Sequence, residues 1–218
     1  RADRKTSGRE SITAKLTANL LEKSGVDRVL AMDLHSAQIQ GYFDIPCDHI
    51  YGSPVLIDYL ETLNLDEVVV VSPDVGGVAR ARAFAKQMKD APLAIIDKRR
   101  AAHNIAESLT VIGEVKGKTA ILIDDMIDTG GTICSGANLL KKEGAKRIFA
   151  CASHAVFSPP SYERLSTKDL FEQVIVTNSI PVVIKDSFPQ LKVLSVANML
   201  GEAIWRIHEE SSVSSMFR

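Results

Sequence analysis

One segment in the middle of the chain combines two carboxylates with a glycine-rich loop. In TAILIDDMIDTGGTI, residues 119–133, an apolar run ends in Asp124 and Asp125, and a short loop then leads into a helix-like pattern. The loop consists of Asp128, Thr129, Gly130, Gly131 and Thr132. Glycines let backbone N–H groups approach an anion, a helix N-terminus adds partial positive charge, and threonine hydroxyls donate hydrogen bonds. The loop is therefore suited to a phosphate monoester.

The two aspartates indicate that a sugar accompanies the phosphate. Carboxylates aimed at a phosphate would repel it, whereas carboxylates beside it can accept hydrogen bonds from hydroxyl groups, as on a ribose. A sugar 5-phosphate satisfies both halves of the segment. The pattern GxxxxGK[ST] of nucleotide P-loops is absent. The alternative is a plain strand-to-helix turn with a threonine N-cap, which leaves the aspartate pair and both glycines unexplained.

Apolar runs that alternate with amphipathic segments must position these residues. The runs are rich in Val and Ile and show little alternation, which predicts strands buried on both faces of a parallel sheet. They cover residues 28–34, 67–72, 93–97, 119–124, 147–153, 173–177 and 192–196. Helical patterns cover residues 12–23, 78–88, 132–143 and 198–210, with a further helix expected after Pro54 and a short one after Pro160. This alternation predicts a doubly wound α/β fold, with ligands at the carboxyl ends of the strands.

The bulk composition is that of an ordinary globular chain. It has 218 residues, of which 45% are hydrophobic and 24% charged, and a formal net charge of −1. We therefore expect no nucleic-acid partner, and the lack of a long apolar run predicts no membrane helix. Three cysteines without metal-ligand spacing, Cys47, Cys134 and Cys151, favour a reducing, cytoplasmic location. Because the chain begins without Met, we expect it to be part of a longer protein.

Three further motifs stand at the ends of other apolar runs. They are DLHSAQIQGYFDIP (residues 33–46), VSPDVGGVARA (residues 71–81) and IIDKRR, which ends at Arg100. Together with residues 119–133 they resemble, in the same order, the motifs of the ribose-phosphate pyrophosphokinases, also called phosphoribosyl-pyrophosphate synthetases. The resemblance continues to the ending SVSSMF. It implies two similar doubly wound parallel-sheet lobes of the type I phosphoribosyltransferase fold, with the first lobe incomplete.

The resemblance also implies a division of the chain and a reaction. Residues 1–54, joined by residues 196–218, would be the remaining part of the N-terminal lobe, and residues 55–195 the C-terminal phosphoribosyl-binding lobe. The enzymes of the family transfer the pyrophosphoryl group of ATP to the 1-hydroxyl of ribose 5-phosphate, giving 5-phosphoribosyl 1-pyrophosphate and AMP. They are commonly hexamers built from dimers, and they respond to ADP and phosphate.

Two residues resemble the metal ligands of the family. His35 matches the histidine that coordinates Mg²⁺ near the ATP phosphates, and Asp74 matches a ligand on the Mg²⁺ or pyrophosphate side. A carboxylate oxygen is a ligand that Mg²⁺ prefers. From the residues alone, the alternative for His35 is a structural histidine. The alternative for Asp74 is a turn aspartate that caps the helix expected at Val78. The roles of Asp33 and Asp44 stay open between metal binding and loop hydrogen bonds.

The remaining site residues are basic or belong to the N-terminal segment. Lys98 resembles the catalytic lysine of the family, and Arg100 the arginine that contacts the substrates, including ribose 5-phosphate; the role of Arg99 is open. Positive charge here suits phosphoryl transfer, although a basic triplet is usually a solvated patch. Arg1, Ala2 and Asp3 resemble the ATP-binding segment, in which many relatives carry Arg-Gln-Asp. Ala2 therefore lacks the side-chain contact of that glutamine.

Two rival functions remain open on the sequence alone. A salvage phosphoribosyltransferase would use the same phosphate loop, but it leaves the DLHSAQIQGYF motif and the Lys98 segment without a role. A non-catalytic regulatory homologue would bind sugar phosphate only, and the presence of Lys98, Arg100, His35 and Asp74 argues against it.

Overall fold

The computed structural model describes residues 2–5, 8–99 and 108–217. The chain divides into two compact units, Arg1–Gly52 with Ala197–Arg218, and Ser53–Val196. Each unit has its own parallel strands, and each is described by itself below.

The larger unit is built on a seven-stranded sheet with the order β5-β4-β3-β6-β7-β8-β9. The strands are β3 (Val68–Ser72), β4 (Leu93–Arg99), β5 (Ser108–Ile112), β6 (Thr119–Ile127), β7 (Arg147–Ala155), β8 (Gln173–Thr177) and β9 (Leu191–Leu194). Neighbouring strands are parallel except at the edge, where β5 pairs antiparallel with β4. The sequence prediction of an α/β fold with a parallel sheet is confirmed.

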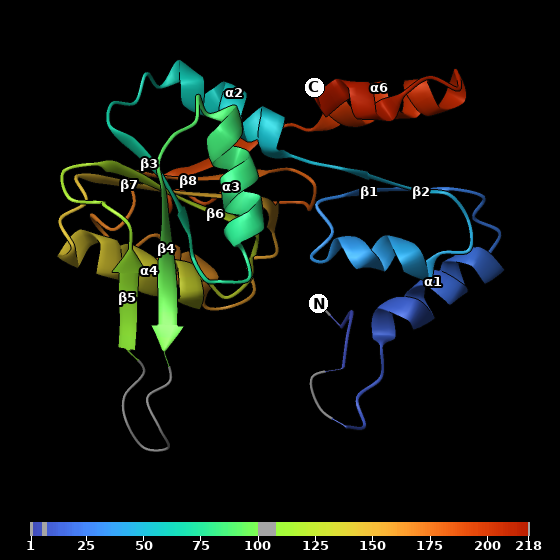
Figure 1. Ribbon diagram of the computed structural model, residues 1–218, viewed down its shortest axis with the longest axis horizontal. Coiled ribbons are helices and arrows are strands. Elements are labelled where there is room, and N and C mark those ends of the chain that lie inside the picture. Colours follow the sequence, from blue (N-terminus) through green and yellow to red (C-terminus); the bar gives the residue numbers. More distant parts are fainter. Residues whose placement is uncertain (1, 6–7, 100–107, 218) are drawn as a thin grey trace. The chain divides into compact units, whose positions relative to one another are not determined.

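Helices cover both faces of this sheet (Figure 1). The helices are α2 (Ser53–Thr62), α3 (Val78–Gln87), α4 (Gly131–Lys142) and α5 (Ser161–Leu165). Alternate residues of β6 show how both faces are buried: Ile121 and Ile123 pack with α2 and α3, whereas Ala120 and Leu122 pack with α4. A strand covered on both sides has no polar face, which explains its continuous apolar run.

The strand order creates one point at which the chain changes direction across the sheet. From β3 the chain passes through α3 to β4, whereas from β6 it passes through α4 to β7, on the other side of the sheet. Because β3 and β6 are hydrogen-bonded neighbours, their carboxyl ends lie side by side while the segments that follow them diverge. Open α/β sheets bind their ligands in such a crevice.

The smaller unit contains one pair of parallel strands, β1 (Val29–Met32) and β2 (Cys47–Ile50). Around them lie α1 (Thr13–Lys23), η1 (Ala37–Tyr42), α6 (Ala197–His208) and η2 (Val213–Phe217). The ring of Phe217 meets the ring of Tyr51 edge-on at 6.1 Å between centroids, which connects the C-terminal segment to the end of β2. Within the described part of the chain, no helix is long and apolar enough to cross a membrane.

Two predictions about the strands were incomplete. The strands β2 and β5 were not expected, and β4 continues to Arg99 rather than ending at residue 97. As a result, Lys98 and Arg99 belong to β4 and pair with Leu109 and Ser108 of β5 instead of opening a loop. The stretch 108–112 alternates polar and apolar residues at the sheet edge, a weaker signal than a fully buried run.

The core position of Leu122 gives a test of the fold. Leu122 is fully buried in β6, so Leu122→Ala should lower the free energy of unfolding by about 2–5 kcal/mol, because it removes packed methyl groups and leaves a cavity. Lys142→Ala, an exposed change in α4, should shift it by less than about 0.5 kcal/mol. Urea unfolding followed by circular dichroism measures both, and equal stabilities would contradict this packing.

Candidate functional site at the carboxyl ends of β3 and β6

An arginine from α3 contacts both carboxylates at the end of β6. The Nη1 atom of Arg80 lies 3.0 Å from Oδ1 of Asp124 and 3.2 Å from Oδ1 of Asp125. The side chain of Asp125 is 2% exposed, whereas those of Asp124 and Arg80 are 24% and 29% exposed. A carboxylate buried to this degree needs a cation or several donors close by. Arg80 supplies that charge at the edge of the crevice.

The two carboxylates strongly perturb each other. Burial, together with the hydrogen bond and the charge of Asp125, raises the pKa of Asp124 to about 7, against the opposing positive charge of Arg80. The Oδ1 atom of Asp124 also accepts a hydrogen bond of 2.9 Å from the N–H of Asp125. Asp124, the carboxyl group with the raised pKa, is also the more exposed of the two.

The glycine-rich loop has the backbone that anion binding requires. Gly130 has φ +74°, in the left-handed region, and it stands directly before α4, whose first hydrogen bond runs from the N–H of Cys134 to the carbonyl of Gly130 at 3.0 Å. The first N–H groups of a helix have no acceptor within it, so those at the start of α4 are available to an anion. No side chain caps this helix, so the alternative of a threonine N-cap is wrong.

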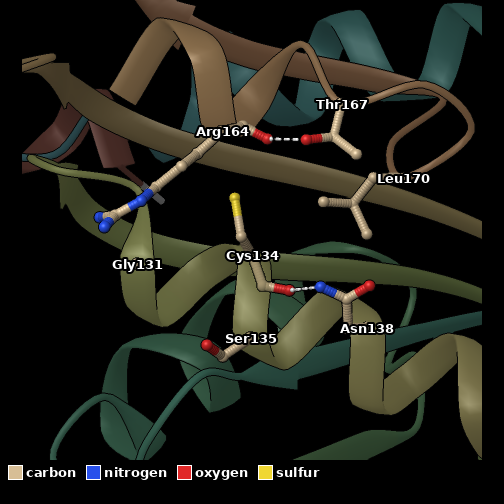
Figure 2. Close-up of a pocket in the computed structure, with 7 residues that line it drawn as sticks. All are labelled: Gly131, Cys134, Ser135, Asn138, Arg164, Thr167 and Leu170. Atoms are coloured by element: carbon tan, nitrogen blue, oxygen red, sulfur yellow. Dashed lines mark hydrogen bonds between the residues drawn. The ribbon is translucent and has the colours of Figure 1, made fainter. Parts of the chain in front are cut away.

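A second arginine, from α5, holds the outer side of the loop (Figure 2). The Nη1 atom of Arg164 donates a hydrogen bond of 3.1 Å to the carbonyl of Thr129. The same atom would lie 3.4 Å from a Cβ atom at Gly131, and a Cβ atom at Gly130 would lie 3.4 Å from Cγ of Leu165. The short helix α5 therefore packs tightly against the loop and fixes one of its carbonyl groups.

A pocket of about 320 Å³ lies between α4 and the segment around α5. It is lined by Gly131, Cys134, Ser135, Asn138, Arg164, Thr167 and Leu170. Figure 2 shows the sulfur of Cys134 directed away from α4 toward the side of Arg164 and Leu170. Burial raises the pKa of the Cys134 thiol to about 11, against the opposing charge of Arg164. The thiol is therefore protonated at neutral pH, and the pocket adjoins the glycine-rich loop at Gly131.

Asp74 follows β3 at the other side of the crevice. Its Oδ1 atom accepts a hydrogen bond of 2.8 Å from the N–H of Gly77, the residue before α3, so the turn role considered for it is present. The side chain is exposed, and within the described residues its Oδ2 atom takes no hydrogen bond. Because Mg²⁺ is usually held by one or two carboxylates, waters and substrate phosphates, one such oxygen fits it. Nowhere in the described ranges do three or more His, Cys, Asp or Glu residues cluster as a ready-made metal site.

The segment of His35 lies in the smaller unit, between β1 and η1, and His35 is exposed. Two side chains shape this segment: Oδ2 of Asp33 accepts a hydrogen bond of 2.8 Å from the N–H of Gly52, and Nε2 of His49 accepts one of 3.0 Å from the N–H of Leu34. Burial lowers the pKa of His49, against the opposing charge of Asp33. Asp33 therefore makes the loop hydrogen bond that was one of its two possible roles.

Other predicted residues are placed as follows. Asp44 is exposed and lies 3.6 Å from Nζ of Lys15 through its Oδ2 atom. The carbonyl of Ala2 accepts a hydrogen bond of 3.1 Å from the N–H of Ala14, and the hydroxyl of Tyr42 donates one to the carbonyl of Asp3. Arg1 and Arg100 lie outside the described residues, and only the backbone of Lys98 is described, in β4.

The comparisons with known proteins identify the family of the chain. A family model, the phosphoribosyl synthetase-associated domain, matches residues 100–218. A ribose-phosphate pyrophosphokinase of Prochlorococcus marinus subsp. pastoris is 94% identical over 218 residues, which is all of this chain and 66% of the relative. Ribose-phosphate pyrophosphokinase 1 of Spinacia oleracea is 66% identical over 220 residues, 65% of its length. This chain belongs to the ribose-phosphate pyrophosphokinase family.

A solved structure supports the same assignment at the level of the fold. The phosphoribosylpyrophosphate synthetase of Mycobacterium smegmatis is 45% identical, has a TM-score of 0.89, and is matched over 96% of this chain and 68% of its own. The chain thus spans about two thirds of the length of these family members.

The raised pKa of Asp124 predicts how stability depends on pH. Its folded pKa, about 7, lies above the ordinary 3.8, so between these values the folded state holds a proton that the unfolded state has lost. The free energy of unfolding should therefore fall as pH rises from about 4 to about 7, and then level off. At about 1.4 kcal/mol per pKa unit, the total fall should be a few kcal/mol.

The Asp124→Asn variant isolates this contribution. The asparagine does not titrate, so the variant should lose less stability than the parent protein between pH 5 and pH 8, and the titrating groups other than its neighbour Asp125 cancel in the comparison. Urea unfolding of both proteins at the two pH values measures the difference. Parallel curves would mean that Asp124 has an ordinary pKa.

Proposed function

We propose that the chain is the larger part of a ribose-phosphate diphosphokinase. The reaction transfers the β,γ-pyrophosphoryl group of ATP to the 1-hydroxyl of ribose 5-phosphate, with AMP as the leaving group and 5-phosphoribosyl 1-pyrophosphate as the product. The observation that carries the proposal is the pairing of a carboxylate with an amide-lined loop at the crevice between β3 and β6. The product supplies nucleotide biosynthesis.

The ribose 5-phosphate half of the site is proposed to be the segment from Asp124 to Thr132. The loop residues Asp128, Thr129, Gly130, Gly131 and Thr132 hold the 5-phosphate through backbone N–H groups and hydroxyls. Asp124, half-buried at the crevice, accepts a hydrogen bond from a ribose hydroxyl. Asp125, the buried member of the pair, binds Arg80, the arginine that also contacts Asp124.

The ATP half is proposed to involve His35, Asp74 and the N-terminal residues Arg1, Ala2 and Asp3. A bound Mg²⁺ would neutralise charge on the phosphates, with His35 and Asp74 as its protein ligands. The exposed Oδ2 atom of Asp74 is a suitable oxygen donor, and the bond from Gly77 to Oδ1 fixes its direction. Positioning by fixed groups accounts for much of the catalysis in phosphoryl transfer.

Lys98 and Arg100 are proposed to stabilise the charge that develops on the transferring phosphorus. The backbone of Lys98 lies in β4, which is the strand next to β3, and Asp74 follows β3. Arg100 follows that strand and is proposed to contact ribose 5-phosphate as well. Cationic groups that meet the transferring group stabilise its transition state more than its ground state.

The arrangement of the whole protein is also a proposal. We interpret the unit Ser53–Val196 as the phosphoribosyl-binding lobe and the unit Arg1–Gly52 with Ala197–Arg218 as part of the N-terminal lobe. Like other members of the family, the protein is expected to form hexamers from dimers in the cytoplasm and to respond to ADP and phosphate.

Production of AMP separates this function from its rivals. A protein of the relatives' full length that carries this sequence is mixed with ATP, Mg²⁺ and ribose 5-phosphate, and AMP is measured by chromatography. We expect AMP that depends on the sugar phosphate. A salvage phosphoribosyltransferase makes no AMP from these reactants, and a non-catalytic homologue binds ribose 5-phosphate without turnover. Either result would overturn the proposal.

The loop can be tested separately through its side chains. Thr129→Val with Asp128→Ala keeps the glycines and removes two polar side chains, so the KM for ribose 5-phosphate should rise about 10-fold, because the Thr129 hydroxyl no longer donates a hydrogen bond to the charged phosphate. Thr110→Val, an exposed change on β5, serves as the matched control and should leave the KM unchanged. An unchanged KM in the loop variant would show that the phosphate binds elsewhere.

A further inference from the structure

Asp124 and Asp125 are adjacent in sequence but unequal in the structure. The side chain of Asp125 is 2% exposed and that of Asp124 is 24% exposed, although both lie at the end of β6. Only Asp124 therefore presents much of its carboxylate to a ligand. Asp125 is too deeply buried to offer an open face, so its charge acts within the protein.

The two oxygens of Asp124 also have different surroundings. Oδ1 is engaged twice, by Nη1 of Arg80 at 3.0 Å and by the N–H of Asp125 at 2.9 Å. The carboxyl group also shares a hydrogen bond with the side chain of Asp125, and among the residues that the structure describes no amide, guanidinium or hydroxyl donates to Oδ2. A carboxylate held through one oxygen has a fixed plane, which directs the other oxygen. Arg80 and the Asp125 amide thus determine where Oδ2 points.

Arg80 is itself held in place from two sides. Its guanidinium contacts Oδ1 of Asp125 at 3.2 Å as well as Asp124, so one nitrogen bridges both acids. A Cβ atom at Gly77 would lie 3.8 Å from that nitrogen and 3.6 Å from Oδ1 of Asp74. The first turn of α3 therefore brings Arg80 close to both sides of the crevice, whereas the atom that a Cβ at Gly77 would crowd is Oγ of Ser72, at 3.0 Å.

We infer that Arg80 is a positioning residue for ribose recognition: anchored by the buried Asp125, it fixes Asp124 so that Oδ2 accepts a hydrogen bond from a ribose hydroxyl. The inference rests on the proposed function, since it takes ribose 5-phosphate as the ligand of this site. It assigns the two acids different roles, Asp124 as the contact with the sugar and Asp125 as the anchor of the arginine.

A purely structural role would predict a different pattern of binding. If Arg80 only neutralised buried charge, its loss would weaken or spare all ligands of the loop alike, because the loop binds the phosphate that they share. If Arg80 orients Asp124, its loss should weaken only the interaction with the sugar hydroxyl. Ribose 5-phosphate and its 2-deoxy and 3-deoxy analogues, which share the phosphate, distinguish these two roles.

The experiment measures the dissociation constants of the three sugar phosphates by calorimetry, on a protein of the relatives' full length. The parent protein should bind ribose 5-phosphate about 10-fold more tightly than at least one deoxy analogue, as expected for one hydrogen bond to a charged group. Arg80→Gln should reduce that preference to about twofold or less, through weaker binding of ribose 5-phosphate alone. Arg82→Gln, an exposed arginine on the same helix, should keep the parent preference.

Three further variants keep the test decisive. Arg80→Gln deprives the buried Asp125 of this cation, so Arg80→Gln with Asp125→Asn removes both charges and should fold while still losing the preference. Asp124→Asn should also lose it, and adding Arg80→Gln to Asp124→Asn should change the affinity little further, because Arg80 acts through Asp124.

The outcomes separate this inference from the function on which it rests. A parent protein that shows no preference for ribose 5-phosphate over either analogue would overturn both. A parent preference that survives in Arg80→Gln overturns the role of Arg80 alone. Equal weakening of all three ligands, or additive losses in the double variant of Asp124 and Arg80, would show that the arginine supports the loop as a whole.

Discussion

The site depends on one ion pair, between Arg80 and the buried carboxylate of Asp125. A charge that is 2% exposed would be costly without a partner, and the partner comes from α3, the helix that follows the neighbouring strand. The pair therefore joins the end of β6 to the segment after β3. The two sides of the crevice cannot shift apart without breaking the contact of Arg80 with both acids.

Strand order is what makes this pair possible. Arg80 and the acids that it contacts, of which Asp124 lies 44 positions away in sequence, meet because β3 and β6 are hydrogen-bonded neighbours and the chain leaves them in opposite directions. Had β4 lain between them, α3 would follow a more distant strand and Arg80 could not reach Asp124. The apolar runs of Val and Ile thus contribute to function indirectly, because they place β6 between helical layers at the centre of the sheet.

The sequence predicted the buried elements and missed the edges and the pairings. Strands such as β6 and β7 are covered on both faces, so their residues 120–123 and 148–152 form continuous apolar runs that are easily recognised. The strands β2 and β5 are short and partly exposed, and they carry no such run. The loop and the acid pair were predicted as a site because their residues are consecutive in the sequence. Arg80 and Arg164 were not assigned roles, because periodicity does not record which distant residue an arginine meets.

Arg80 and Arg164 together explain how one short segment can serve a ligand with two different halves. Arg80 fixes the carboxylate of Asp124, which precedes the loop and can accept a hydrogen bond from a hydroxyl group. Arg164 fixes the carbonyl of Thr129 within the loop, and the amides of that loop can donate to an anion. Acceptor and donor groups so close in the chain would otherwise bond to each other or turn toward solvent. Because each is held by a different helix, the segment can present both at once, as a phosphorylated sugar requires.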